Sequence, residues 1–380
     1  MFAIRGKLLL GGEIVRGAVV VDGARLLAVT KSLDEGSLPD EIIDAEIIAP
    51  GFIDLQVNGA FGVEVGEDPE ALRHLARELP RTGVTALLPT LVSSPADLYP
   101  RVFAAFEAAC GSPGAELLGL HLEGPYLAPA RAGAHRREVI AAADALPVEA
   151  LLEPGHARIV TLAPERAGAV ERIEAIRARG AVVSLGHTHA TFEEFTRGVD
   201  AGATMATHLY NAMSPFEHRA PGAVGAALTD PRITVGLIVD GVHFHEAAAR
   251  LAFTAKGEGR IALVTDAMPA AGMPPGEYAL GGQRVRVDER SARLLDGTLA
   301  GSILTMDAAV RGAMRAAGAS VTAALRMASE VPARLLGLAD KGVLRAGADA
   351  DLVLLNGELE VLATLARGKW AYRRPASVGL

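Results

Sequence analysis

Eight short apolar runs, alternating with helix-like segments rich in Ala, Arg and Glu, divide the middle of the chain. They are GFIDLQVN (51–58), VTALLPTL (84–91), LLGLHLEG (117–124), ARIVTLAPE (157–165), AVVSLGHT (181–188), ATMATHLY (203–210), ITVGLIVDG (233–241) and IALVTDAM (261–268). This alternation predicts βα units and a parallel sheet. Because eight strands are enough to close a barrel, we predict the α/β class and a (β/α)8 TIM barrel.

An open, doubly wound sheet is the structural alternative. That fold normally carries a glycine-rich phosphate loop directly after its first strand. The segment after the first run, GAFGVEVGED, matches neither G-x-G-x-x-G nor a P-loop. The barrel is therefore favoured.

The two ends of the chain have a different character from the middle. Residues 1–48 and the stretch DADLVLLNGELEVLATLARGKWAY are short strands separated by turn residues. Because chain termini often lie close together, we expect both ends to form one small β-sandwich domain. The predicted boundaries are 1–48 with 345–380 for this domain, and 49–344 for the barrel.

Composition excludes several classes of protein. The net charge of -8 argues against a general nucleic-acid surface, which needs clustered Lys and Arg. Cys110 is the only cysteine, so no intrachain disulfide can form, which fits a reducing compartment. No apolar run approaches the ~20 residues that span a bilayer, and the N-terminus lacks a signal-peptide pattern. We therefore expect a cytoplasmic protein with no membrane partner.

Four acidic or histidine side chains stand where strand-like runs end. They are Glu123, His187, His208 and Asp266. In a (β/α)8 barrel the carboxyl ends of the strands meet at one face, where catalytic groups gather. Two histidines and a carboxylate can bind a metal and leave one coordination position open for water. The pattern predicts a metal-dependent hydrolase.

Seven strings extend this pattern into a family resemblance. They are PGFIDLQVNG, HLEGPYLAPARAGAH, LGHTHAT, THLYNAMSPFEHRAPGAVGA, DGVHF, LVTDAMPAAG and LAGSILTM. In order and spacing they resemble the N-acetylglucosamine-6-phosphate deacetylase family of the amidohydrolase superfamily, from about Pro50 to Ala309. HLEGP and THLYNAM are highly specific strings, whereas PGFID marks only the superfamily.

The resemblance implies roles for five residues. Glu123, His187 and His208 would be the three metal ligands, with water in the fourth position. Asp266 would be the general base and acid, and His135 would help to polarise the acetamide carbonyl. The reaction implied is hydrolysis of N-acetyl-D-glucosamine 6-phosphate to D-glucosamine 6-phosphate and acetate.

The resemblance also implies a substrate site and a homodimer. Arg219 and His243 would contact the phosphate, and Arg219 would come from the neighbouring subunit. Asn211 and Ala212 would meet the phosphate end of the sugar. The segment from Leu299 to Ile303 would line the acetyl pocket.

The chemistry of these residue types agrees with the implied reaction. A three-ligand Zn²⁺ can lower the pKa of bound water to about 7 and polarise a carbonyl. Asp266 can take a proton from that water and return it to the leaving amine. Arg219 suits a phosphate because its planar fork donates two hydrogen bonds. We expect one divalent metal per subunit, Zn²⁺ before Fe²⁺, Mn²⁺ or Co²⁺.

Two departures from the superfamily pattern bear on the metal site. Many members carry H-x-H at the end of the first strand, where this chain has Gln56 and Asn58. Amides are weak metal ligands, so we expect no second metal. His189, two residues after His187, could compete as a ligand, and we favour His187 because it follows Gly186 in the L-G-H string.

Other polar residues have simpler interpretations. His121 is interpreted as a packing residue or a support for the site, and His218 as a loop residue. His245 is as readily a helix cap as a substrate contact. Asp54 and Asp240 could orient neighbouring groups rather than bind metal.

Two other functions stay open. A barrel of this kind could act on another N-acyl amino sugar phosphate, an N-acyl amino acid or a cyclic amide. A barrel that binds a sugar phosphate without turnover belongs to a different class. It is disfavoured because degenerate enzymes usually lose a ligand or the base, and Glu123, His187, His208 and Asp266 are all present.

Overall fold

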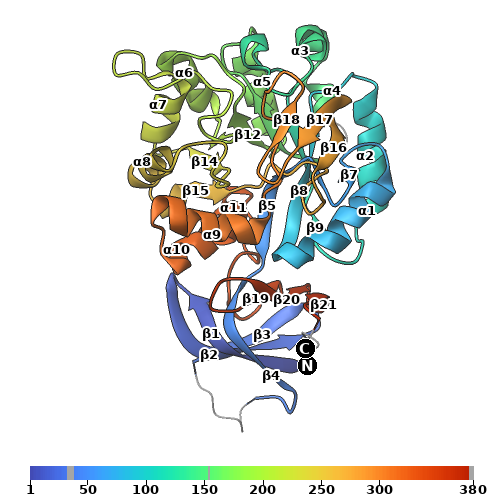
Figure 1. The fold of residues 1–380 in the computed structure, drawn as a ribbon, viewed down its shortest axis with the longest axis vertical. Helices are drawn as coiled ribbons and strands as arrows, with labels where there is room; N and C mark the ends of the chain where they lie inside the picture. Colours follow the sequence, from blue (N-terminus) through green and yellow to red (C-terminus); the bar gives the residue numbers. More distant parts are fainter. Residues whose placement is uncertain (32–37, 153–154, 376–380) are drawn as a thin grey trace.

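Eight parallel strands form a closed barrel in the computed structural model, which describes residues 1–31, 38–152 and 155–375 (Figure 1). Their order is β15-β14-β13-β12-β11-β10-β8-β5. The strands are β5 (Phe52–Val57), β8 (Val84–Val92), β10 (Leu120–Glu123), β11 (Ala157–Leu162), β12 (Val182–Leu185), β13 (Met205–Ala206), β14 (Thr234–Leu237) and β15 (Ile261–Leu263). All eight lie inside or within one residue of the predicted runs, so the predicted barrel is confirmed.

The seam of the barrel closes between β5 and the segment that follows β15. Asp266 N donates to Gln56 O at 2.9 Å, and Asn58 N donates to Ala267 O at 2.8 Å. A parallel bridge joins Val57 to Ala267 at the same place. The first strand and the last one therefore bring Gln56, Asn58 and Asp266 together.

Helices surround the barrel. They are α1 (Pro69–Glu78), α2 (Leu98–Ala109), α3 (Arg137–Ala142), α4 (Glu149–Leu152), α5 (Ala169–Ala178), α6 (Phe192–Ala201), α7 (Gly222–Thr229), α8 (Glu246–Lys256), α9 (Met306–Ala317), α10 (Val321–Ala328) and α11 (Glu330–Leu335). Local sequence sets several of the starts. Thr191 and Glu194 form a reciprocal capping box that begins α6, and Asp68 caps α1 ahead of Pro69.

Segments from both ends of the chain build a second body, which lies below the barrel in Figure 1. Its seven-stranded sheet has the order β21-β20-β19-β4-β1-β2-β3. The strands are β1 (Phe2–Leu10), β2 (Glu13–Asp22), β3 (Arg25–Thr30), β4 (Ile42–Pro50), β19 (Leu352–Leu355), β20 (Val361–Ala366) and β21 (Lys369–Arg373).

This sheet encloses its own apolar core. Ile4, Leu26 and Ile48 from the N-terminal strands pack with Leu352 and Leu365 from the C-terminal ones. The predicted β-sandwich domain from both termini is therefore confirmed. The boundary predicted at 48/49 falls within β4 and stays a prediction. Residues 376–380 of the predicted domain lie outside the described residues.

Lys341 joins the two bodies through a buried ion cluster. Its Nζ lies 2.7 Å from Glu116 on β9 (Glu116–Leu117), 2.9 Å from Asp349 and 2.7 Å from Asp351. The lysine side chain is only 7% exposed. Burial alone would lower the pKa of Lys341, but Asp351 and its neighbours raise it, so the ammonium stays charged.

A three-stranded sheet is inserted between β15 and α9. It consists of β16 (Gly276–Leu280), β17 (Gln283–Val287) and β18 (Ala292–Leu294), in that order. Sequence analysis did not predict it, although Gly281-Gly282 between two alternating segments is a hairpin signal. Another short hairpin pairs β6 (Gly59–Ala60) with β7 (Val63–Glu64).

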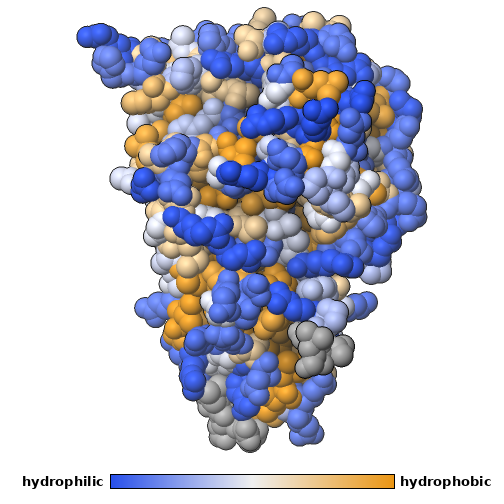
Figure 2. Space-filling view, viewed as in Figure 1, coloured by the Kyte–Doolittle hydropathy of each residue, from blue (hydrophilic) through white to orange (hydrophobic). Residues whose placement is uncertain are grey.

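Polar residues cover most of the face drawn in Figure 2, and hydrophobic residues there form separate patches. Within the described ranges, no helix is both long and apolar enough to cross a bilayer.

Candidate active site

The four predicted site residues lie together at the carboxyl ends of the barrel strands. Glu123 ends β10, and the other three follow β12, β13 and β15. His187 (φ 47°), His208 (φ 26°) and Asp266 (φ 49°) adopt the left-handed backbone region. Non-glycine residues there cost roughly 1–3 kcal/mol each and cluster at functional sites. The backbone turns sharply at each strand end and directs these side chains into a common pocket.

We call this hollow the central pocket. It is lined by Asn58, Val92, Glu123, Arg131, His135, His187, His208, Asn211, Ala212, His243, Asp266, Leu280, Thr298 and Leu299, among others. The lining combines carboxylates, imidazoles and amides with apolar side chains. Such a pocket suits a small polar substrate that carries an apolar group.

Glu123, His187 and His208 form a tight triangle of donor atoms. Glu123 Oε1 lies 3.3 Å from His187 Nε2 and 3.0 Å from His208 Nε2, and the two nitrogens are 3.1 Å apart. Around a tetrahedral Zn²⁺ with bonds of about 2.1 Å, neighbouring ligand atoms are about 3.4 Å apart. The three predicted ligands therefore have the spacing that one such ion needs.

A hydrogen bond prepares the imidazole of His187 for this role. His187 Nδ1–H donates to the carbonyl of Arg131 at 2.8 Å, which leaves Nε2 free of a proton and able to ligate. His208 Nδ1 is buried without a partner among the described residues. Burial alone would raise the pKa of Glu123, but its contacts with His135, His187 and His208 lower it well below its ordinary value. Glu123 is thus a carboxylate at neutral pH.

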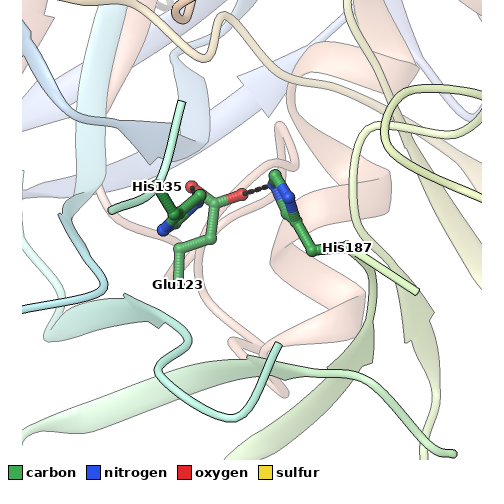
Figure 3. Close-up of side chains that lie close together, drawn as sticks. All are labelled: Glu123, His135 and His187. Atoms are coloured by element: carbon green, nitrogen blue, oxygen red, sulfur yellow. Dashed lines mark ion pairs between the residues drawn. The ribbon is translucent and has the colours of Figure 1, made fainter. Parts of the chain in front are cut away.

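His135 and His187 lie on opposite sides of the Glu123 carboxylate, as Figure 3 shows. Glu123, His135 and His187 can also be chosen as a group of three possible ligands. However, the backbone N–H of Ser93 donates to His135 Nδ1 at 3.1 Å, so the ring proton belongs on Nε2. This Nε2–H lies 3.5 Å from Glu123 Oε2. A protonated nitrogen is a hydrogen-bond donor, and this geometry favours His208 over His135 as a third ligand.

Asp266 is held by the two amides that replace the H-x-H histidines. Asn58 Nδ2 donates to Asp266 Oδ1 at 2.6 Å, and Gln56 Nε2 donates to Asp266 Oδ1 at 3.1 Å and Glu123 Oε1 at 3.0 Å. Burial raises the pKa of Asp266 to about 6, and the charge of Glu123 adds to this effect. A carboxyl group with such a pKa can both accept and return a proton near neutrality.

A second layer of polar contacts fixes the backbone next to Asp266. Thr265 Oγ1 donates to Asp54 Oδ2 at 2.6 Å, and Ser302 Oγ donates to Thr265 O at 2.5 Å. Asp54 is fully buried, and burial raises its pKa to about 7. Asp54 thus orients neighbouring groups, as the sequence suggested it could.

The structure separates the predicted substrate contacts into two groups. Asn211, Ala212, His243 and Leu299 line the central pocket. His243 Nδ1 bonds to Asp240 Oδ2 at 2.7 Å, which orients the ring. Ile303 packs against the apolar cluster that contains Met268 and Leu280, and it is not among the residues that line the pocket.

Arg219 lies outside the central pocket of its own chain. It is exposed and lines a neighbouring hollow, the side cavity, together with Arg131, His189, Phe192, Glu193 and Glu217. A position away from its own pocket is compatible with the predicted reach into a neighbouring subunit.

Three other histidines named in the sequence, His121, His189 and His245, have structural contacts. His121 is fully buried between Leu55 O and Thr161 Oγ1, and burial lowers its pKa to about 4. His245 accepts from Ala247 N and caps α8. His189 Nδ1 accepts from Arg131 Nε at 3.3 Å and does not line the central pocket. His218 is exposed in the loop before Arg219.

Sequence analysis missed Val92, Arg131 and Leu280 as lining residues of the pocket. Val92 ends β8 and could have been found by the same rule of strand ends. Leu280 depends on the inserted sheet. Arg131 follows HLEGP within a quoted string, but nothing in its spacing shows which way it points.

A barrel with ligand-type side chains and a buried carboxylate at its strand ends defines a class, the metal-dependent barrel hydrolases. The chain belongs to the Amidohydrolase family, whose profile matches residues 47–371. Human N-acetylglucosamine-6-phosphate deacetylase is 42% identical over 390 residues, which cover 98% of this chain and 95% of that protein. N-acetylgalactosamine-6-phosphate deacetylase of Escherichia coli O157:H7 is 40% identical over 334 residues, which cover 86% and 88%.

A solved structure is similarly close. A mutant of the Mycobacterium smegmatis N-acetyl-D-glucosamine-6-phosphate deacetylase, in complex with N-acetyl-D-glucosamine-6-phosphate, superposes with a TM-score of 0.89. The two sequences are 34% identical, and the match covers 97% of this chain and 99% of that chain.

Proposed function

We propose that this chain hydrolyses the acetamide of N-acetyl-D-glucosamine 6-phosphate, giving D-glucosamine 6-phosphate and acetate. The observation that carries the proposal is the combination, in one pocket, of three ligand atoms 3.0–3.3 Å apart with the buried carboxylate of Asp266. The similarity to deacetylases over nearly the whole chain supports the choice of substrate.

Glu123, His187 and His208 would hold one divalent metal. When bound, the ion supplies a water of lowered pKa and polarises the acetamide carbonyl. Two imidazoles and a carboxylate suit Zn²⁺, and Fe²⁺, Mn²⁺ or Co²⁺ fit the same donor set. Gln56 and Asn58 direct their NH₂ groups at Glu123 and Asp266, which disfavours a second cation there.

Each of the other side chains in the pocket has a separate role in the reaction. Asp266 takes a proton from the attacking water and delivers it to the nitrogen of the leaving amine. His135 Nε2–H donates to the oxygen that becomes negatively charged, a contribution of about 3 kcal/mol in comparable sites. His243 binds the phosphate, and Leu299 with Leu280 and Val92 encloses the acetyl methyl group.

We further propose a cytoplasmic homodimer in which Arg219 reaches the neighbouring subunit's substrate. Phe216, three residues before Arg219, is 52% exposed, and the whole loop from 215 to 220 is exposed. Phenylalanine and arginine are both enriched at protein interfaces relative to the rest of the surface. Cys110 as the single cysteine fits a reducing compartment.

The test is amine release from four samples. N-acetylglucosamine 6-phosphate is compared with N-acetylgalactosamine 6-phosphate and with unphosphorylated N-acetylglucosamine, and metal-depleted protein serves as the fourth sample. Metal-dependent release from the gluco phosphate in preference to the others supports the proposal. A preference for N-acetylgalactosamine 6-phosphate would make that sugar phosphate the substrate. Absence of amine release from all of the sugars would refute the assignment.

A further inference from the structure

Arg131 contacts the proposed metal ligand His187 and also lines the central pocket. It ends the short turn Pro129–Arg131 that follows β10. Its backbone N–H donates to Ala128 O at 2.8 Å, and its carbonyl accepts from His187 Nδ1 at 2.8 Å. The main chain of Arg131 is therefore fixed on both sides, and its side chain starts from a defined point beside the ligand His187.

The side chain of Arg131 is also oriented. Its Nε donates to His189 Nδ1 at 3.3 Å, which leaves both terminal NH₂ groups of the guanidinium for another acceptor. Within the described part of the chain, no carboxylate lies in ion-pair contact with Arg131. The adjacent Glu165 accepts from Thr188 Oγ1 at 2.5 Å and His189 N at 2.6 Å.

Arg131 and Arg219 occupy different positions relative to the site. Arg131 lines both the central pocket and the side cavity, so it stands between the two. Arg219 lines only the side cavity. Arg131 lines the central pocket together with the proposed phosphate contacts His243, Asn211 and Ala212. A subunit's own arginine is thus available to the pocket that would hold the sugar phosphate.

We propose that Arg131 binds the phosphate group of the substrate within its own subunit and sets the preference for a phosphorylated sugar. This inference rests on the proposed function. The fixed backbone and the bond to His189 direct the guanidinium fork, which matches two oxygens of a phosphate ester. His189 acts as its positioning residue, which explains a second histidine next to the ligand His187.

The test compares Arg131→Met, which keeps an unbranched apolar stem and loses the charged head, with Arg131→Lys, which keeps charge and loses the fork. KM and kcat are measured with N-acetylglucosamine 6-phosphate, and kcat/KM with the unphosphorylated sugar. Inhibition by inorganic phosphate gives a direct readout of anion binding. Arg136→Met is the matched control, because Arg136 lies in the same loop but pairs with Glu138 at 2.8 Å and does not line the central pocket.

For Arg131→Met we expect KM to rise about 10- to 100-fold, with a much smaller change in kcat. The preference for the phosphorylated sugar and the affinity for inorganic phosphate should fall by a similar factor. Arg131→Lys should show an intermediate loss, and Arg136→Met should behave as wild type.

Two results overturn the inference. One is an unchanged KM and unchanged phosphate inhibition in both Arg131 variants, with the loss seen only in Arg219→Met. The other is an equal fall of kcat on both sugars, which would mean that Arg131 acts only through its contact with His187. A wild-type protein without turnover would refute the proposed function instead, so the two failures are distinguishable.

Discussion

Replacing Lys341 by Met removes the cation that three carboxylates share at the junction of the barrel and the β-domain. Asp351 is the carboxylate that is destabilised most, because its side chain is only 4% exposed. The side chains of Asp349 and Glu116 are 18% and 34% exposed. Breaking a buried ion pair by removing one partner costs about 3–5 kcal/mol, since the other charge stays buried. We expect Lys341→Met to lower the free energy of unfolding by about that amount.

The loss should depend on pH in a defined direction. In the wild type, the raised pKa of Lys341 means that its contribution is fully present below about 10.4, the unfolded value for lysine. In the variant, buried carboxyls without a cation have folded pKa values above their unfolded ones. Their penalty is therefore present at high pH and relieved as the pH falls through the folded pKa. The difference between the two proteins should shrink from about pH 8 to about pH 5.5.

Urea denaturation at both pH values measures this difference. Lys369→Met, at an exposed lysine on β21, is the control and should change the free energy of unfolding by less than about 0.5 kcal/mol. Adding Asp351→Asn to Lys341→Met should restore part of the loss. A loss below about 1 kcal/mol, or one that is equal at the two pH values, would refute the reasoning.

Three further predictions concern the site. Asp266→Asn should lower kcat by about 10²- to 10⁴-fold with unchanged metal content, and retained turnover would contradict its role as base. Glu123→Gln should lower the metal bound per subunit, measured by elemental analysis after dialysis; full occupancy would remove Glu123 from the ligand set. Asn58→Leu deletes the 2.6 Å hydrogen bond to Asp266. Steady-state kinetics should show a kcat about 10- to 100-fold lower and little change in KM. An unaffected kcat would mean that Gln56 alone suffices to hold the base.

The barrel and the central residues could be predicted because both follow from one regularity. Strand-like runs at βα spacing predict a barrel, and the carboxyl ends of its strands must share one face. Glu123, His187, His208 and Asp266 could thus be placed together although they lie far apart in the sequence. The prediction did not need the exact strand bounds, which for β13 are only Met205–Ala206.

The contacts that choose between chemical roles could not be predicted. The tautomer of His135 depends on the Ser93 N–H, and that of His187 on the Arg131 carbonyl. These partners lie on different loops, 42 and 56 residues away in the sequence. Loop paths are set by tertiary packing and carry no periodic signal. The motif that contains Arg131 therefore could not predict which way its side chain points.

The pairing of β4 with β19 has a consequence for synthesis of the chain. Pro50 lies opposite Leu352, so the first four strands leave the ribosome long before the strand that covers the edge of β4. Until then, that edge offers unpaired backbone groups to other chains. Phe2 of β1 stacks on Trp370 of β21, with ring centroids 5.9 Å apart. Joining the C-terminus to the N-terminus through a flexible linker, and opening the chain at a surface loop of the barrel, would make β19–β21 and β1–β4 consecutive. Such a circular permutant should form its β-domain as one local unit, with less aggregation during expression.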